Sequence, residues 1–177
     1  MSHKQIDPYV HTFPAPAVLI GCGTVEKPNL ITCAWFGTVC SEPPQVSVAI
    51  RPSRFSHDLI GDSGEFTVNI PRKSQLDLVK HCGSRSGRDE NKIETLGLTA
   101  KPCPPLSSAP MVVEFPIVLA CGVREILELG THTLFIGEVL AIHAEESDLR
   151  SGGRVNPRSV DQVVYLDGKY WSLAPLD

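Results

Sequence analysis

Residues 29–71, NLITCAWFGTVCSEPPQVSVAIRPSRFSHDLIGDSGEFTVNIP, decide the fold of this chain. They include three runs rich in Val, Ile, Thr, Trp and Phe, the residue types that suit a pleated, half-buried surface. The runs span 29–40, 45–50 and 65–70. Pro43 and Pro44 separate the first two runs, because proline cannot continue a strand ladder. We therefore predict three strands, with a Glu-Pro-Pro turn after the first and a short polar helix after the second.

The segment between the second and third runs has the features of a phosphate site. In RPSRFSH, residues 51–57, two arginines and two serines, Ser53 and Ser56, lie within six residues. Ser56 is predicted to cap a helix over 57–62 whose first backbone N–H groups point outward, where the helix dipole favours an anion. Arg51 and Arg54 offer planar pairs of donors that match phosphate oxygens. The alternative is that both arginines are ordinary surface charges and Ser56 only a helix cap.

The totals of the sequence predict one soluble globular domain over residues 1–177. Hydrophobic residues make up 42% and charged residues 20%, and a chain of this length can bury a proper core. The formal net charge of −4 argues against a nucleic-acid or membrane-surface binder, since such proteins usually carry a basic excess. Any binding site for an anion must therefore come from a local cluster of positively charged and hydrogen-bonding groups.

Two further features predict a cytoplasmic protein without bound metal. The N-terminal residues MSHKQIDPYVHTF contain no apolar signal segment, and Glu114 and Pro116 break the longest apolar run. The six cysteines form no C-x-x-C motif and no paired Cys/His spacing, so a zinc site is not expected. In a reducing compartment most of these cysteines would be small buried hydrophobes.

The rest of the chain adds mainly strands. The sequence predicts a strand over 17–24 and paired strands over 112–128 and 132–144, followed by a final hairpin that turns at Asp167-Gly168. It also predicts a helix over 74–83, with Ser74 as its cap and Gly83 just past its end, and a short helix started by Asp89. Residues 101–110 are predicted to be a proline-rich connector. Gly21 and Gly23 suggest a bulge or a close approach of another backbone or a ligand. The chain has no dinucleotide fingerprint, P-loop or nucleophile elbow. Composition and pattern by themselves stop at a β-barrel or a β-sandwich.

The order of several short motifs narrows this choice. The motifs are Asn29, Thr32, Ala34-Trp35, Ser41-Glu42-Pro43-Pro44, Val46, Val48, Arg51, Ser56, Gly64-Glu65-Phe66, Val68-Asn69, SGRDENK at 86–92, His132 with the strand 134–139, and Tyr165 with Tyr170-Trp171. Together they resemble the flavin reductase-like, FMN-binding split-barrel family, which includes flavoredoxin. The resemblance implies a mainly β fold: a six-stranded antiparallel split barrel with Greek-key connections and two or three short helices. It also implies a homodimer with FMN near the subunit interface.

The same resemblance implies where the cofactor lies. The isoalloxazine is expected against residues 32–41, with its polar edge bonded by backbone groups around Thr32, Ala34 and Trp35. Cys40 and Ser41 are expected near the reactive edge of the ring; the alternative for Cys40 is a buried thiol with no role. The implied cofactor-binding residues are Asn29, Thr32, Ala34, Trp35, Cys40, Ser41, Arg51, Ser53, Arg54, Ser56, Ser86 and Lys92, although a solvated surface loop is the other interpretation of the last two.

The resemblance further implies an activity. Relatives carry a histidine that faces the flavin and the nicotinamide at the position of His132, so this residue and Cys40 are the candidates for catalysis; a polar surface histidine is the alternative. We expect an NAD(P)H-dependent flavin reductase, without a Rossmann domain, that passes electrons to free flavin or to a partner protein. The alternatives are a flavoredoxin-like electron carrier that keeps its FMN and does not turn over NAD(P)H, and a flavin-binding protein without redox turnover.

Overall fold

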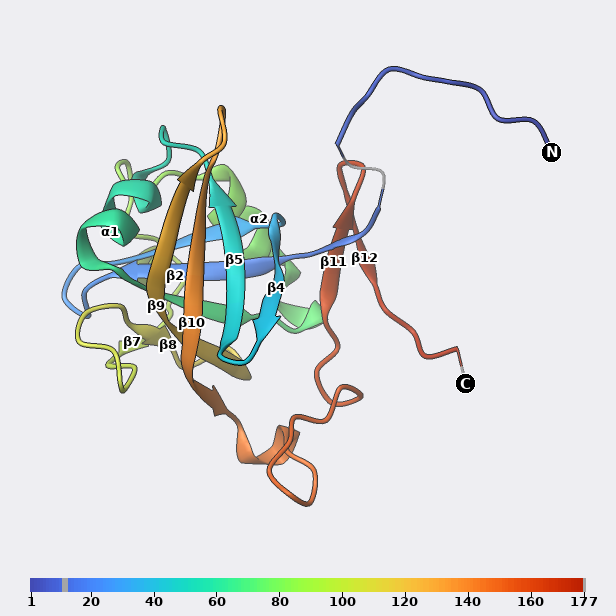
Figure 1. Cartoon of the computed structure of the whole chain (residues 1–177). Helices are drawn as coiled ribbons and strands as arrows, with labels where there is room; N and C mark the ends of the chain where they lie inside the picture. Colours follow the sequence, from blue (N-terminus) through green and yellow to red (C-terminus); the bar gives the residue numbers. More distant parts are fainter. Residues whose placement is uncertain (11–12, 177) are drawn as a thin grey trace.

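Seven strands form one antiparallel sheet in the computed structural model, which describes residues 1–10 and 13–176. In sheet order they are β3 (Pro28–Cys33), β2 (Val18–Gly23), β6 (Glu65–Ile70), β9 (Ile117–Glu128), β10 (Thr133–Ala144), β5 (Pro44–Ile50) and β4 (Phe36–Ser41). The sheet curls into the barrel-like body of Figure 1. The predicted fold class is therefore confirmed, as is the long β9–β10 hairpin.

The predicted strand over 29–40 is two strands, and this raises the count in the main sheet from the expected six to seven. The chain leaves β3 at Cys33, bends through Ala34 and Trp35, and resumes as β4 at Phe36. β3 pairs with β2 at one edge of the sheet and β4 pairs with β5 at the other. A hydrogen bond from the Ala49 amide to the Trp35 carbonyl, 2.9 Å long, holds the bend against the end of β5. The break is therefore the place where the chain passes from one edge of the sheet to the other.

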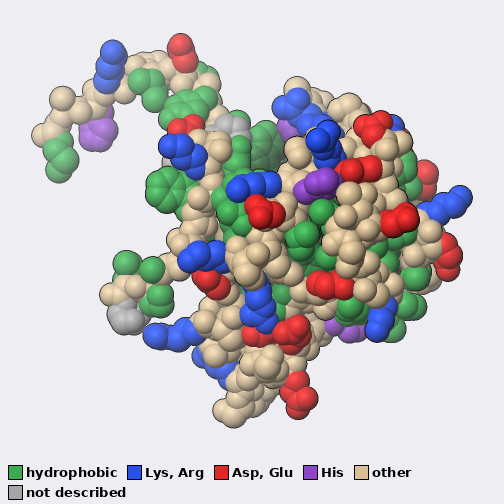
Figure 2. Space-filling model, turned by 180° about the vertical axis from the view of Figure 1, so that it is seen from behind, with side chains coloured by type: hydrophobic (Ala, Val, Ile, Leu, Met, Phe, Trp, Pro, Cys, Tyr) green, Lys and Arg blue, Asp and Glu red, His purple; other side chains and the backbone are tan. Residues whose placement is uncertain are grey.

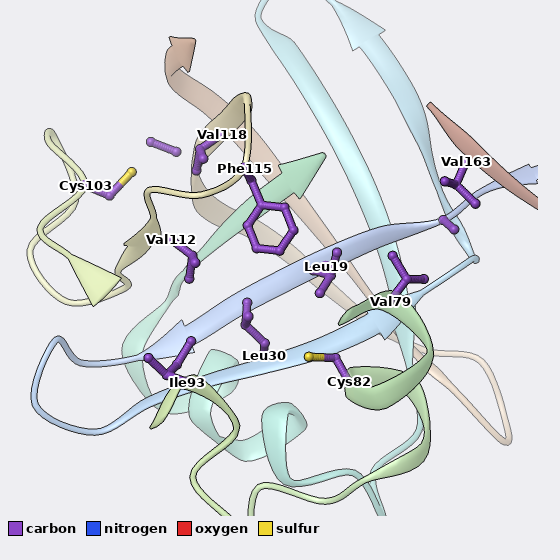
Figure 3. Packing of buried hydrophobic residues seen from close by; sticks show 12 residues of the cluster. Leu19, Leu30, Val79, Cys82, Ile93, Cys103, Val112, Phe115, Val118 and Val163 are labelled. Atoms are coloured by element: carbon purple, nitrogen blue, oxygen red, sulfur yellow. The ribbon is translucent and has the colours of Figure 1, made fainter. Parts of the chain in front are cut away.

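Side chains of β2 alternate between two hydrophobic clusters found among the described residues. Leu19 packs with Leu30, Val79 and Phe115 between the sheet and the helix α2 (Leu76–Ser84), as Figure 3 shows. Ile20 packs on the other face of β2; its cluster includes Val48, Phe66 and Phe135 from three other strands. All six residues of β2 are buried, which explains its nearly continuous apolar sequence.

The helices begin and end at residues other than those predicted. They are α1 (Phe55–Ser63), the 3₁₀ turn η1 (Lys73–Gln75), α2 (Leu76–Ser84), α3 (Lys92–Thr95) and the 3₁₀ turn η2 (Glu146–Asp148). Arg54, not Ser56, occupies the N-cap position of α1, because Ser56 is turned into the protein and buried. Gly83 lies inside α2, which continues to Ser84, and Ser74 lies within η1. Asn91, not Asp89, caps α3, since its side chain accepts a hydrogen bond from the Glu94 amide.

A small second sheet lies beside the barrel (Figure 1) and we call it the arm; its Val163 is buried in the same cluster as Leu19. It consists of β1 (Ala15–Pro16), β11 (Val163–Leu166) and β12 (Lys169–Ser172). Asp167 and Gly168 form its turn with φ of 48° and 77°, the paired positive values of a two-residue hairpin, as predicted. β7 (Ala100–Lys101) and β8 (Met111–Val112) flank the predicted proline-rich connector. No helix in residues 1–10 and 13–176 is long and apolar enough to cross a membrane.

Candidate functional site

Two adjoining pockets lie at the end of the barrel where α1 begins. They share Ile31, Thr32 and Arg54. The narrow pocket, about 110 Å³, lies between β3, the first turn of α1 and the segment that follows α2. The wide pocket, about 240 Å³, lies along the β3–β4 bend and the end of β5. An elongated ligand could therefore extend from one pocket into the other.

Lys92 supplies a buried positive charge to the wall of the narrow pocket. The residue is 2% exposed, and its ammonium group donates to the carbonyls of Leu30 and Arg85. No salt bridge of Lys92 is found within the described residues, and burial lowers the pKa of its ammonium group. A buried cation without a paired anion is costly. An anion in this pocket would offset that cost.

Asn29 and Ser56 form a buried polar pair in the same wall. The Asn29 amide nitrogen lies 2.7 Å from the Ser56 hydroxyl oxygen and 3.6 Å from the Cys22 sulfur. The Asn29 Oδ1 atom is buried and has no hydrogen-bond partner among the described residues. The Ser56 hydroxyl also interacts with the Cys22 thiol, so Asn29, Ser56 and Cys22 form one buried polar group. The Asn29 Oδ1 atom is the acceptor that this group leaves for a bound molecule.

Gly87 allows the segment after α2 to lie directly on this pair. A Cβ atom at Gly87 would stand 2.2 Å from Asn29 Oδ1 and 2.7 Å from the Phe55 ring. Such contacts are far inside the van der Waals limit, so a side chain here would force the segment outward. Glycine at this position therefore keeps the narrow pocket small.

Trp35, His132 and Arg51 form the rim of the wide pocket. The Trp35 and His132 rings lie 4.2 Å apart between centroids, and the Arg51 Nε atom lies 3.4 Å from His132 Nε2. Because a guanidinium only donates, His132 Nε2 accepts, and its Nδ1 donates to the Thr131 hydroxyl at 2.9 Å. Burial and the Arg51 charge lower the pKa of His132. At neutral pH His132 is thus an uncharged ring beside a permanent cation.

The structure brings most of the predicted site residues to these pockets. Asn29, Thr32, Ser53, Arg54, Ser56, Ser86 and Lys92 line the narrow pocket, and Thr32, Ala34, Trp35, Arg51, Arg54 and His132 line the wide one. Arg51 and Arg54 were predicted to hold one phosphate together. Instead, Arg51 lies at the rim beside His132, whereas Arg54 lines both pockets. Arg51 directly follows the last residue of β5, and Arg54 is the N-cap residue of α1.

Cys40 and Ser41 line neither pocket. They sit at the far end of β4, where Ser41 pairs with Pro44, whereas the rim lies at the opposite end, next to Trp35. Six residues of strand span about 20 Å. The Cys40 sulfur contacts the Glu42 carbonyl of its own turn at 3.4 Å. Within one chain, Cys40 and Ser41 therefore lie apart from the two pockets, and their place beside the flavin stays a prediction.

The sequence interpretation missed several residues of the narrow pocket. These are Ile31, Phe55, Cys82, Gly83, Arg85 and Gly87. Gly83 was interpreted as a helix end, but it lies within α2, where a Cβ atom would approach the Thr32 side chain to 3.4 Å. The signal that could have found it is a glycine on the helix face that packs against a strand.

Comparison with known proteins identifies the family. Residues 10–174 match the sequence profile of the Flavin reductase like domain. The chain belongs to this family. The flavin reductase-like chain is similar to flavoredoxin of Desulfovibrio vulgaris (Miyazaki F), with 30% identity, a TM-score of 0.90, and coverage of 99% of this chain and 95% of that one.

Two relatives extend the comparison. An uncharacterized protein of Archaeoglobus fulgidus is 36% identical over 87% of this chain and 85% of its own length. An NADH-dependent FAD reductase of Streptomyces globisporus is 27% identical over 80% of this chain and 78% of its own length. The chain is thus a member of a family of flavin-dependent oxidoreductases.

The residues of both pockets fit a flavin nucleotide. The narrow pocket combines the buried Lys92 cation, the Ser56 hydroxyl and the start of α1, where the helix dipole favours phosphate. The orphaned Asn29 Oδ1 can accept from a hydroxyl group, which the sugar-like chain of a flavin nucleotide carries. The wide pocket is bounded by aromatic and backbone groups suited to a planar ring.

Proposed function

We propose that this protein is an FMN-binding flavin reductase that takes hydride from NAD(P)H and passes electrons to free flavin or to a partner protein. The observation that carries the proposal is the pair of adjoining pockets: a small cationic one and a wider one with an aromatic rim, joined at Thr32 and Arg54. Bound flavin would supply the redox chemistry, accepting hydride from a nicotinamide and releasing electrons one or two at a time.

The narrow pocket supports FMN as the preferred flavin. A terminal phosphate monoester would lie within reach of Lys92, Arg54 and Ser56, and charged groups make the stronger hydrogen bonds. Riboflavin has no phosphate to use this pocket. FAD would have to place its adenylate outside this pocket, which has a volume of only about 110 Å³.

The rim of the wide pocket supports a nicotinamide as the electron donor. Hydride transfer needs one open face of the ring and a group that orients the nicotinamide. His132 stacks on Trp35 and is uncharged at neutral pH, so it would orient the carboxamide by hydrogen bonding. Arg51, rather than His132, would supply positive charge to the anionic donor molecule.

Stopped-flow reduction under anaerobic conditions tests the proposal. A reductase reconstituted with FMN should lose its flavin colour rapidly on mixing with NADH or NADPH, and the substitution His132→Ala should slow this reduction while leaving FMN affinity and reduction by dithionite unchanged. Rapid bleaching that does not depend on His132 would keep the reductase and remove His132 from its mechanism.

The second candidate is a flavoredoxin-like carrier with permanently bound FMN. The similarity to the Desulfovibrio flavoredoxin over nearly the whole chain favours it. In a carrier neither nucleotide would reduce the flavin at a useful rate, although dithionite would. The same stopped-flow experiment therefore separates the two candidates.

We also propose a cytoplasmic homodimer. Figure 2 shows the N-terminal segment projecting from the body of the protein, with hydrophobic side chains along it. Trp171, Leu173 and Phe13 are 54%, 59% and 70% exposed. An exposed apolar extension of this kind suits contact with a second copy related by a twofold axis. The six cysteines are all free thiols, which supports a reducing compartment.

A further inference from the structure

Arg85, Ser86 and Gly87 form one wall of the narrow pocket, and the segment 85–91 that contains them is held by contacts with neighbouring residues. The Lys92 ammonium group holds the Arg85 carbonyl at 3.1 Å, and His81 of α2 contacts the Glu90 carboxylate at 2.6 Å. Between these ties, Gly87 lies against Asn29. The opposite wall is the start of α1 with the residues before it, Ser53 to Ser56.

Arg88 joins the two walls. Its Nη1 atom donates to the Ser53 carbonyl at 3.0 Å, and its guanidinium carbon lies 5.4 Å from the centre of the Phe55 ring. Its Nη2 atom is 4.0 Å from the Asp58 carboxylate. All of these partners lie on the wall opposite to the backbone of Arg88. The guanidinium group thus crosses from one wall to the other.

Arg88 is not itself among the residues that line the pocket. Its guanidinium group is turned to the outer surface, where the side chain is 48% exposed. The surface ion pair with Asp58 is worth little, but the carbonyl bond and the contact with the Phe55 ring add to it. Arg88 therefore bridges the two walls through contacts that can break, and it does not line the pocket as a phosphate ligand would.

We propose that Arg88 is a positioning residue that latches the narrow pocket and sets the rate at which FMN leaves it. This inference rests on the proposed FMN site and deepens it. A phosphate held between the two walls is released when the walls separate, so breaking the Arg88 contacts should speed its release. The latch would retain FMN between turnovers, as a bound cofactor requires.

Dissociation kinetics of two flavins test the latch. Flavin fluorescence recovers on release, so the dissociation rates of FMN and riboflavin can be measured by rapid dilution for the wild type, Arg88→Ala, Arg88→Lys and the control Arg124→Ala. Arg124 forms an exposed ion pair with Glu138 and lines neither pocket. We expect Arg88→Ala to release FMN about tenfold faster, a change that matches the loss of a bond and a cation–π contact. Arg88→Lys should be intermediate, and Arg124→Ala should resemble the wild type.

The dissociation rate of riboflavin distinguishes the proposed role of Arg88 from a general effect of the substitution on the structure. Because riboflavin has no phosphate, its dissociation rate should be the same in the wild type and in Arg88→Ala. An unchanged FMN rate in Arg88→Ala, or an equal acceleration for both flavins, would overturn the latch. A wild-type protein that binds riboflavin as tightly as FMN, or binds neither, would instead refute the FMN site on which the latch rests.

Discussion

Single residues decide the chemistry at the rim of the wide pocket. Arg51 donates to His132 Nε2, which leaves the imidazole proton on Nδ1 toward Thr131. A protonated His132 would have to face Arg51 with a second positive charge. The geometry therefore assigns the roles of neutral hydrogen-bonding group to His132 and of cation to Arg51.

The pKa of His132 provides a direct test of this assignment. Burial and the Arg51 charge lower it, so the ring should titrate below its ordinary value of 6.5. Reduction by NAD(P)H should accordingly stay constant at neutral pH and change only as the pH falls through this lowered pKa. In Arg51→Ala the pKa should rise, because a neighbouring positive charge is removed. NMR titration of the His132 ring measures both midpoints; a midpoint above 6.5 in the wild type would contradict the assignment.

The two arginines of the segment 51–57 should differ in their effect on FMN binding. Arg54 lines the narrow pocket and Arg51 does not. Arg54→Ala should weaken FMN by the loss of a charged hydrogen bond, on the order of 1.5–3 kcal/mol, and should affect riboflavin less. Arg51→Ala should leave the preference for FMN over riboflavin unchanged. Fluorescence titration with both flavins measures this, and equal losses of FMN affinity in the two variants would restore the shared phosphate site.

At the scale of elements, the segment after α2 shapes the narrow pocket through its backbone. Lys92, Gly87 and Arg88 fix it to β3 and to the start of α1. The pocket therefore depends on the approach of three elements that are separate in the sequence, and its size depends on how closely the segment lies on Asn29.

Two glycine substitutions compare a position where a new methyl group would clash, Gly87, with a position where it would meet no other atom, Gly61. In Gly87→Ala the new methyl group would meet Asn29 and Phe55, so we expect FMN affinity to fall by about tenfold or more as the segment is displaced. Gly61 lies in α1 with no atom near its missing Cβ, so Gly61→Ala should preserve binding and stabilise the helix by about 0.5–1 kcal/mol. Titration with FMN and thermal unfolding measure the two effects. Unchanged FMN affinity in Gly87→Ala would show that the segment does not close the pocket.

At the scale of the whole molecule, the arm is the feature that the barrel alone does not explain. β11 pairs with β1 on one side and with β12 on the other. Val163 of β11 is buried in a core cluster, whereas Trp171 of β12 is 54% exposed. Tyr165 and Tyr170 stack edge to face at 5.2 Å, so the hairpin has an ordered aromatic face of its own. A sheet this small is marginal without further packing.

We expect this arm to be covered by a second copy. Sedimentation of the FMN-loaded protein at micromolar concentration should show a dimer, and Trp171→Ser should shift the equilibrium toward monomer because the side chain is 54% exposed in the single chain. Lys101→Ser, at an exposed position in β7, serves as the control. A wild-type monomer with bound FMN would refute the expectation.

The sequence by itself determined the class of fold and named most of the polar residues that line the two pockets. Strand-forming runs, the proline-rich connector and the Asp167-Gly168 turn are local signals, and local chemistry largely specifies them. The order of motifs indicated the family, and with it residues such as Asn29, Ser56 and Lys92 that the structure brings to one pocket.

The tertiary structure alone decided how these residues are divided. Arg51 and Arg54 are near neighbours in sequence, yet the turn between them, closed by a hydrogen bond from the Arg54 amide to the Arg51 carbonyl, places Arg51 at the rim and Arg54 against both pockets. The break at Ala34 and Trp35 carries Cys40 and Ser41 away from both pockets, and the register of β4 on β5 fixes that separation. Ser56 is buried against Asn29 although its position suggested an exposed cap. Each outcome depends on which elements pack together. Asn29 and Ser56 are 27 residues apart, and Arg51 and His132 are 81 residues apart. Contacts over such separations leave no pattern in a local stretch of sequence.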